Sequence, residues 1–231
     1  MQNNRESQSC YDSIYDRVIK YQVRAECREP LHIGSGEKEQ GEILIHPVED
    51  RPFIPATGIA GAFREHFTDE ELRNEMFGNV NENGSDGSRV RFCDGFFEKA
   101  SVETELRPHV KIDGETGTCQ SNAVKGAAIS SGQKFEIESV AAGSEFAFYV
   151  YIFEKERSYE KPFEEALEAL HCGNIQFGGQ KSNGCGYVKL ASVKKSVYTM
   201  TDENDRKQWS KEEKAMRDIT AETVSYTHLT L

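Results

Sequence analysis

The sequence predicts a domain of the α+β class, on the basis of three observations. Polar and apolar residues alternate over residues 17–27, as in a half-buried strand. Phe163, Ala166, Leu167 and Leu170 lie at helical spacing, which predicts an amphipathic helix. The chain has 231 residues, a length that suits one domain of roughly 150–250 residues with insertions, or at most two small domains.

The predicted elements follow one another in the order strand, helix, strand, strand, helix, strand. The first helix covers residues 55–64, with Pro55 in its first turn. A capping-box pattern at Thr68 predicts a second, short helix that stops at Gly78, followed by a loop over residues 79–88. Further strands are expected at 89–99, 134–140, 146–153 and 187–197. This is the order of a ferredoxin-like (RRM-like) fold.

Outside that order, the sequence divides into an arm, a domain and a tail. Residues 1–16 are polar and patternless, which predicts a flexible arm. The domain covers residues 17–200 and carries an insertion at about 100–133. Residues 201–231 are expected to form a charged tail, in which the pattern at Ser210 predicts the start of a short surface helix. The last eight residues carry no charge, and the sequence leaves open whether they are native.

The charge of the chain is unevenly distributed. The formal net charge is -11, which argues against nucleic-acid binding because affinity for phosphate comes from lysine and arginine. Residues 171–201, however, contain no acidic residue and four lysines. This strip is either a local basic footprint or ordinary scatter. The four lysines are Lys181, Lys189, Lys194 and Lys195.

Cysteine usage and hydropathy restrict the location of the protein. The six cysteines form no CxxC pair, so a structural zinc site is not expected. The sequence has no signal-peptide pattern, so we expect a cytoplasmic protein without disulfides. No apolar run approaches the roughly twenty residues of a membrane span, and we therefore expect no membrane partner.

The strongest local signal is a glycine-rich loop at residues 178–186. It contains Gly178, Gly179 and Gly184 together with Lys181, Ser182 and Asn183. Backbone amides that no side chain covers donate to phosphate oxygens, and a lysine adds positive charge. The loop lacks the spacing of a Walker A motif, and a strand rather than a helix follows it. The alternative is a tight connection from helix to strand.

Four motifs, in order along the chain, resemble those of a known family. They are residues 31–34, residues 53–64, Arg107 with residues 111–118, and residues 177–187. Together they resemble the RAMP superfamily of CRISPR-associated proteins, and most of all the repeated backbone subunit of type III effector complexes. The resemblance covers roughly residues 17–200.

This resemblance implies a guide-RNA-binding subunit that stacks in several copies along the crRNA. The first helix and the glycine loop would grip phosphates, and the insertion would form a thumb-like hairpin that wedges between bases. Ala60 stands where a lysine is common in the family. The implied partners are crRNA, target RNA, copies of the chain itself and other type III effector subunits. The implied RNA-binding residues are His32, Gly34, Ser35, Thr57, Arg64, Arg107, Lys111, Lys125, Gly178, Gly179, Lys181, Ser182, Asn183 and Gly184.

Target cleavage in the family depends on an aspartate just ahead of a Pro-Val pair and on a divalent metal. Here His46 precedes Pro47 and Val48, and the aspartate is missing. His46 and Glu42 are the remaining candidates, because a histidine can act as a general base near pH 7. A lone loop histidine is also commonly a surface residue. We expect binding without strong cleavage, no tightly bound cofactor, and Mg²⁺ or Mn²⁺ only if cleavage is retained.

Two other interpretations of the same residues stay open. The chain is alternatively a RAMP protein with a different role, either a guide-processing endoribonuclease with His66 or His32 as its base, or a capping subunit present once per complex. It is otherwise an acidic protein-interaction module in which the glycine loop is only a turn. Bound RNA that depends on Lys181 would distinguish the RNA-binding interpretations from this last one.

Overall fold

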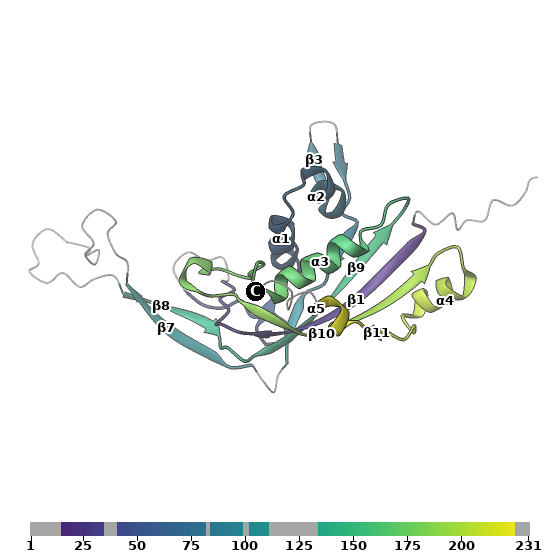
Figure 1. Ribbon diagram of the computed structural model, residues 1–231. Coiled ribbons are helices and arrows are strands. Elements are labelled where there is room, and N and C mark those ends of the chain that lie inside the picture. Colours follow the sequence, from purple (N-terminus) through teal and green to yellow (C-terminus); the bar gives the residue numbers. More distant parts are fainter. Residues whose placement is uncertain (1–14, 35–40, 82–83, 99–101, 111–133, 225–231) are drawn as a thin grey trace, which may run out of the picture.

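The computed structural model describes residues 15–34, 41–81, 84–98, 102–110 and 134–224. These residues form one main antiparallel sheet, helices that pack on it, and a two-stranded hairpin that projects from one end (Figure 1). Most of the predicted arm, residues 111–133 of the predicted insertion and the end of the chain from residue 225 lie outside the described part.

The main sheet has seven strands, and their order confirms the predicted ferredoxin-like fold. Strand β1 (Arg17–Cys27) lies between β9 (Glu145–Glu154) and β10 (Val188–Thr199), antiparallel to both. Beyond β9 lie β5 (Val90–Phe92) and β6 (Gly95–Phe97). The spatial order is therefore fourth, first, third and second strand, as that fold requires. The two edge strands are β2 (Phe53–Ile54) and β11 (Arg217–Asp218).

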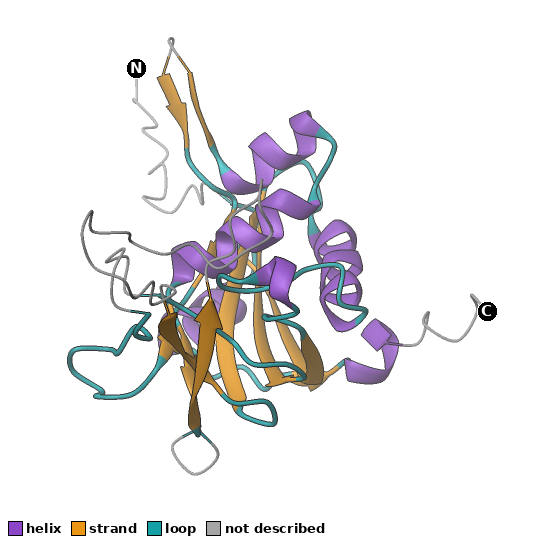
Figure 2. Cartoon of the chain, turned by 90° about the vertical axis from the view of Figure 1, so that its left-hand side faces the viewer, coloured by secondary structure: helices purple, strands orange, loops and turns teal. Residues whose placement is uncertain are grey.

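Helices α1 (Ala56–His66) and α3 (Glu160–His171) cover one face of this sheet (Figure 2). The rings of Phe63 in α1 and Phe163 in α3 lie 5.6 Å apart, and Phe163 lies 5.0 Å from Tyr21 of β1. All three side chains are fully buried, and each contributes on the order of 2 kcal/mol to folding. No helix in the described ranges is long and apolar enough to cross a membrane.

The helix ends differ in detail from the sequence prediction. Pro55 is the N-cap of α1 rather than a residue of its first turn. Helix α2 (Glu70–Phe77) is capped by Asp69 rather than Thr68, because the Asp69 carboxylate accepts two amide hydrogens of the first turn. The predicted end at Gly78 is confirmed, and this glycine has a φ of 80°.

The strand expected at residues 89–99 is two strands, β5 and β6, with Cys93 and Asp94 between them. Asp94 turns out of the sheet, and its carboxylate accepts the backbone amide hydrogen of Ala56 at 2.7 Å. Pro55 has no hydroxyl or carboxylate with which to cap α1, and Asp94 supplies that acceptor from a distant part of the chain. The break in the strand therefore positions the first helix.

Two hairpins extend from the domain. Residues 79–88, expected as a loop, contain the hairpin of β3 (Asn79–Asn81) and β4 (Gly84–Asp86). The second hairpin pairs β7 (Thr104–Val110) with β8 (Lys134–Val140) and forms the stem of the insertion. Residues 134–140, predicted as a strand, therefore belong to this stem and not to the main sheet.

The segment expected as a charged tail is part of the domain up to residue 224. Strand β11 adds to the main sheet beside β10, and Ile219 directly after it is buried. Helix α4 (Glu203–Lys211) is capped by Asp202 and ends at Lys211, so Ser210, where a helix was predicted to start, lies in its last turn. Trp209 of α4 packs on the sheet face opposite α3, 5.1 Å from the Tyr198 ring. The last helix is α5 (Thr220–Val224).

Candidate nucleic-acid interface

The glycine-rich loop is held against the segment that follows β1. The amide of Gly179 donates to the carbonyl oxygen of His32 at 2.8 Å, and the amide of Gly186 donates to that of Pro30 at 2.9 Å. At the tip of the loop, residues Lys181–Asn183 form one 3-10 turn. The structure thus brings together the motif after the first strand and the glycine motif, which are about 145 residues apart in sequence.

Close backbone approach explains two of the glycines. Gly178 has a φ of 72°, and a Cβ added there would overlap the His32 carbonyl oxygen. Gly186 has a φ of 88°, and a Cβ there would overlap the carbonyl oxygen of Phe177. Only glycine combines a left-handed backbone with such contacts. These two positions are therefore required by the fold itself, independently of any ligand.

Helix α1 presents an uncovered backbone surface near this loop. Thr57, Gly58 and Gly61 are exposed. A Cβ added at Gly61 would meet no atom within 4 Å, and one at Gly58 would meet only the Pro55 ring at 4.0 Å. The described part of the chain therefore places nothing against this face. Two glycines in one helix weaken it by about 1 kcal/mol each, so their position on an open face suits close approach by another molecule.

Lys181 connects the loop to that helix. Its Nζ atom lies 3.1 Å from a carboxylate oxygen of Glu65, one turn beyond Gly61. The two side chains are 38% and 76% exposed, so the pair contributes at most about 1 kcal/mol. An incoming phosphate can replace Glu65 at little cost. Loop, α1 and the segment after β1 therefore form one continuous surface.

Arg64 has a role within the fold. Its guanidinium donates to the carbonyl oxygen of Gly78 at 2.8 Å and to the Asn74 side chain at 3.3 Å. These bonds tie α1 to the carboxyl end of α2, where helix carbonyls lack partners and a positive charge is favourable. The RNA contact of Arg64 stays a prediction, and a substitution there would also disturb the pairing of the two helices.

The predicted basic strip is largely neutralised by acidic neighbours. Lys189 pairs with Glu26 at 3.0 Å. Lys195 points to the α3 side of the sheet and lies 2.6 Å from Glu160 and 2.7 Å from Glu164. Burial opposes the charge of Lys195, but the hydrogen bonds that its ammonium donates to these two carboxylates outweigh burial and raise the pKa of the lysine. Of the four lysines in the strip, Lys181 is the one that lies in the glycine loop.

The loop expected to carry cleavage is organised around His46. The Nδ1 atom accepts the amide hydrogens of Val48 and Glu49 at 3.3 and 3.1 Å. Its ring packs 5.0 Å from that of Phe53 and 5.2 Å from that of Phe96. These contacts give His46 a structural role in its turn.

Glu42 is exposed. Within the described ranges, no three His, Cys, Asp or Glu side chains group closely enough to hold a metal ion. The described donors thus do not form a site for the divalent metal that the resemblance implies for cleavage.

Some of the other predicted residues lie at the glycine loop, and others lie elsewhere or outside the described residues. His32 lies beside the loop, with its Nδ1 atom 2.7 Å from the carbonyl oxygen of Glu138 in the insertion stem. Ser182, Asn183 and Gly184 are exposed within the loop, and Gly34 is exposed in the segment after β1. His66 packs edge-on against Phe67, with 5.8 Å between the ring centroids. Ser35, Lys111 and Lys125 lie outside the described residues.

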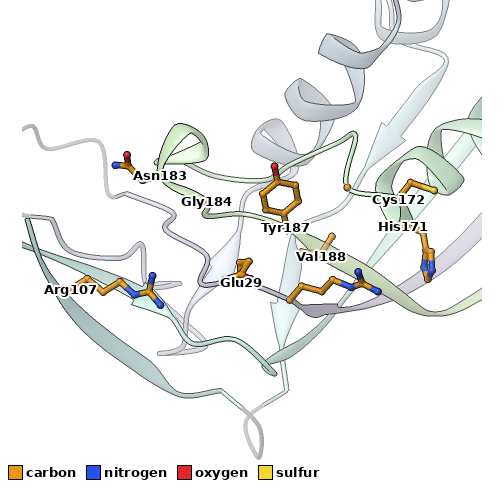
Figure 3. Close-up of a pocket in the computed structure, with 10 residues that line it drawn as sticks. Glu29, Arg107, His171, Cys172, Asn183, Gly184, Tyr187 and Val188 are labelled. Carbon is orange, nitrogen blue, oxygen red and sulfur yellow. The ribbon is translucent and has the colours of Figure 1, made fainter.

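A hollow of about 450 Å³ lies between the glycine loop, the end of α3 and β7 (Figure 3). Arg107, Asn183 and Gly184, all predicted RNA-binding residues, line it. Sequence reasoning did not single out its other polar residues, because they come from three separate segments. The only sequence signal is that Tyr187 directly follows the glycine loop. The remaining lining residues are Arg28, Glu29, His171, Cys172, Gly173, Tyr187 and Val188.

Fold and surface together define a ferredoxin-like protein whose glycine loop meets its first helix. The family model of the RAMP superfamily matches residues 24–189, which is more than half of the chain. The chain belongs to the RAMP superfamily.

One solved structure with a similar fold is described as "Cryo-EM structure of the Type III-B Cmr-beta bound to cognate target RNA". The TM-score is 0.58 at 19% sequence identity, over 80% of this chain and 62% of that chain. This chain thus spans less than two thirds of the length of that relative. A search of curated proteins gives no match.

Proposed function

We propose that this chain is a guide-RNA-binding backbone subunit of a type III CRISPR effector complex. Several copies stack along the crRNA and hold it for pairing with target RNA. Membership of the RAMP superfamily supports this proposal, as does the fold shared with a chain from a complex bound to cognate target RNA. The observation that carries it is the uncovered glycine face of α1 beside the glycine loop, joined by Lys181 and Glu65.

The chemistry of this surface suits a phosphate backbone. Gly58 and Gly61 let a strand approach the helix closely. Thr57 offers a hydroxyl, and Lys181 offers a charge whose partner among the described residues is an exposed carboxylate. Contacts of this kind position a strand without reading its sequence. A subunit that accepts any guide sequence needs this property, because the guide supplies specificity by base pairing.

We further propose that binding is retained while target cleavage is weak or absent. The Nδ1 atom of His46 accepts a backbone hydrogen bond within its own turn, and the described donors do not form a metal site. The proposed partners are crRNA, target RNA, further copies of this chain and other effector subunits in the cytoplasm. No tightly bound cofactor is proposed, and Mg²⁺ or Mn²⁺ enters only if cleavage is retained.

Binding of single-stranded RNA to the purified chain at several salt concentrations tests the proposal. Lys181→Ala should weaken binding and reduce the slope of log K against log salt by about 0.7, the value for one lost phosphate contact in a single strand. Lys161→Ala is the matched control, because Lys161 is an 87% exposed lysine on α3 that also pairs with a glutamate. Equal effects of the two substitutions would contradict the proposal.

A further inference from the structure

The hollow of Figure 3 contains no residue of α1; it shares Asn183 and Gly184 with the glycine loop and lies on the side of the loop that faces β7 and the end of α3. We propose that it is a second RNA contact, which holds one nucleotide with its phosphate at Arg28 and Arg107 and its base against Tyr187. This inference rests on the proposed function. The site extends the path of a bound strand across the tip of the glycine loop to the insertion stem.

The charges in the hollow favour an anion. The guanidinium of Arg28 is exposed and forms no ion pair with any residue that the structure describes. Arg107 pairs with Glu105, two residues away on the same strand, and both side chains are accessible. Glu29 is the one acidic residue in the lining. Two arginines and one glutamate leave the lining at +1; Glu105 outside the lining pairs with Arg107, so Arg28 is the arginine without an ion pair among the described residues.

His171, at the end of α3, lies close to the same positive charges. His171 lines the hollow, and its Nδ1 atom accepts the amide hydrogen of Leu190 at 3.2 Å. Burial lowers the pKa of His171, and the nearby charges of Arg28 and Lys189 lower it further. A neutral imidazole beside two cations leaves their charge available to a ligand.

Tyr187 supplies a ring that the fold holds in place. Its carbonyl oxygen accepts the amide hydrogens of Arg28 and Glu29 at 2.8 and 3.3 Å. Its ring rests against Gly173, where an added Cβ would lie 3.0 Å from the ring. The ring stands beside the loop residues Asn183 and Gly184 in Figure 3. Proteins that bind single strands combine such a ring with cationic side chains, because every base has a face that stacks.

The combination of arginine side chains with the Tyr187 ring favours a nucleotide over an acidic protein segment as the ligand. A carboxylate from a neighbouring molecule would pair with Arg28, but it would leave the Tyr187 ring without a partner. A nucleotide engages both groups, and a guanidinium binds phosphate through two parallel hydrogen bonds. The volume of about 450 Å³ lies in the usual range for small-molecule sites. Asn183 and Gly184 make the hollow continuous with the glycine loop.

Binding of a fluorescent ten-nucleotide oligouridylate to the full chain tests this site. We expect Tyr187→Leu to weaken binding on the order of tenfold, as loss of one stacked base does, and Tyr187→Phe to bind like the wild type. Arg28→Gln should reduce the salt slope by about 0.7. Thermal unfolding checks that each variant is folded.

A second measurement does not depend on how the variants fold. The wild-type chain is photocrosslinked to an oligonucleotide that contains 4-thiouridine, and the adduct is located by mass spectrometry. We expect a crosslink on Tyr187 itself, which fragmentation of the adduct distinguishes from the loop residues Ser182, Asn183 and Gly184 in the same peptide. Crosslinks confined to α1 and to loop residues 181–184 would overturn the proposal.

The outcomes separate this inference from the proposed function. If Lys181→Ala weakens binding while Arg28→Gln and Tyr187→Leu bind like the wild type, the hollow is no RNA contact and the proposed function stands. If Arg28→Gln alters self-association but not RNA affinity, the hollow takes an acidic protein segment and the inference fails. If the wild type binds no RNA at all, both proposals fail.

Discussion

Gly178→Ala tests how the glycine loop is held in place. Gly178 has a φ of 72°, and an added Cβ would overlap the His32 carbonyl oxygen and lie 3.1 Å from the carbonyl carbon. This oxygen accepts the amide hydrogen of Gly179 at 2.8 Å. The methyl group therefore pushes the loop away from the segment after β1 at the point where the two are bonded.

Two contributions determine the size of the effect. The left-handed backbone costs an alanine about 1 kcal/mol or slightly more. Displacement of the loop removes the Gly179 hydrogen bond, which contributes about 1 kcal/mol net. We therefore expect Gly178→Ala to lower the free energy of unfolding by roughly 2–3 kcal/mol. RNA affinity should fall as well, because Lys181 moves relative to α1.

Gly184→Ala and Gly143→Ala are matched controls. Both glycines have a similar positive φ, 81° and 87°, and an added Cβ at either would meet no atom within 4 Å. Each substitution should cost only the backbone contribution of about 1 kcal/mol. Urea unfolding of the three variants gives the comparison. If Gly178→Ala is no more destabilising than the two controls, close approach to His32 does not hold the loop and this reasoning is wrong.

Three further predictions follow from single contacts. Asp69→Ala should lower the free energy of unfolding by about 1 kcal/mol and Thr68→Ala by far less, because the Asp69 carboxylate caps α2. Urea unfolding compares the two variants, and equal losses of free energy would contradict the role of Asp69 as the cap. Lys195→Met should lower stability by roughly 2 kcal/mol, because the half-buried Glu164 loses this counter-charge and Glu160, which also pairs with Arg17, loses one of its two cationic partners. The exposed Lys161→Met should have little effect in the same assay. Burial lowers the pKa of His171 below its usual value of 6.5, so as the pH falls from 7.5 the unfolded chain binds more protons at this residue than the folded chain, and stability decreases. His171→Gln should reduce this loss in unfolding midpoints, and an unchanged pH dependence would refute the prediction.

Local periodicity predicted the elements that form the centre of the fold. Strand β1 was predicted with its observed bounds because its inward residues alternate against the helices. Helix α3 was predicted because its buried residues recur every three to four positions. Sequence could not predict the break at Asp94, since the acceptor it provides is used by Ala56, 38 positions earlier. Helix α4 could not be predicted from periodicity either, because it packs on the sheet through Trp209 while most of its residues face solvent.

The sequence motifs of the candidate surface could be predicted, but the way in which the fold brings them together could not. The glycine pattern predicted the loop, whereas the requirement at Gly178 comes from a carbonyl oxygen 146 positions earlier. The basic strip was misleading, because the acidic partners of Lys189 and Lys195 come from other elements. The hollow that joins Arg28 to Tyr187 has no local sequence signature, since it exists only when the segments come together.

The RNA that accompanies the chain tests the central claim most directly. The chain is co-expressed with its genomic neighbours and purified by a tag, and the bound RNA is sequenced while the copies of the chain per RNA are counted. The account predicts a discrete population of repeat-tagged spacer RNAs, each with several copies of the chain. Absence of RNA, or random cellular fragments in its place, would contradict the assignment as a guide-RNA-binding backbone subunit.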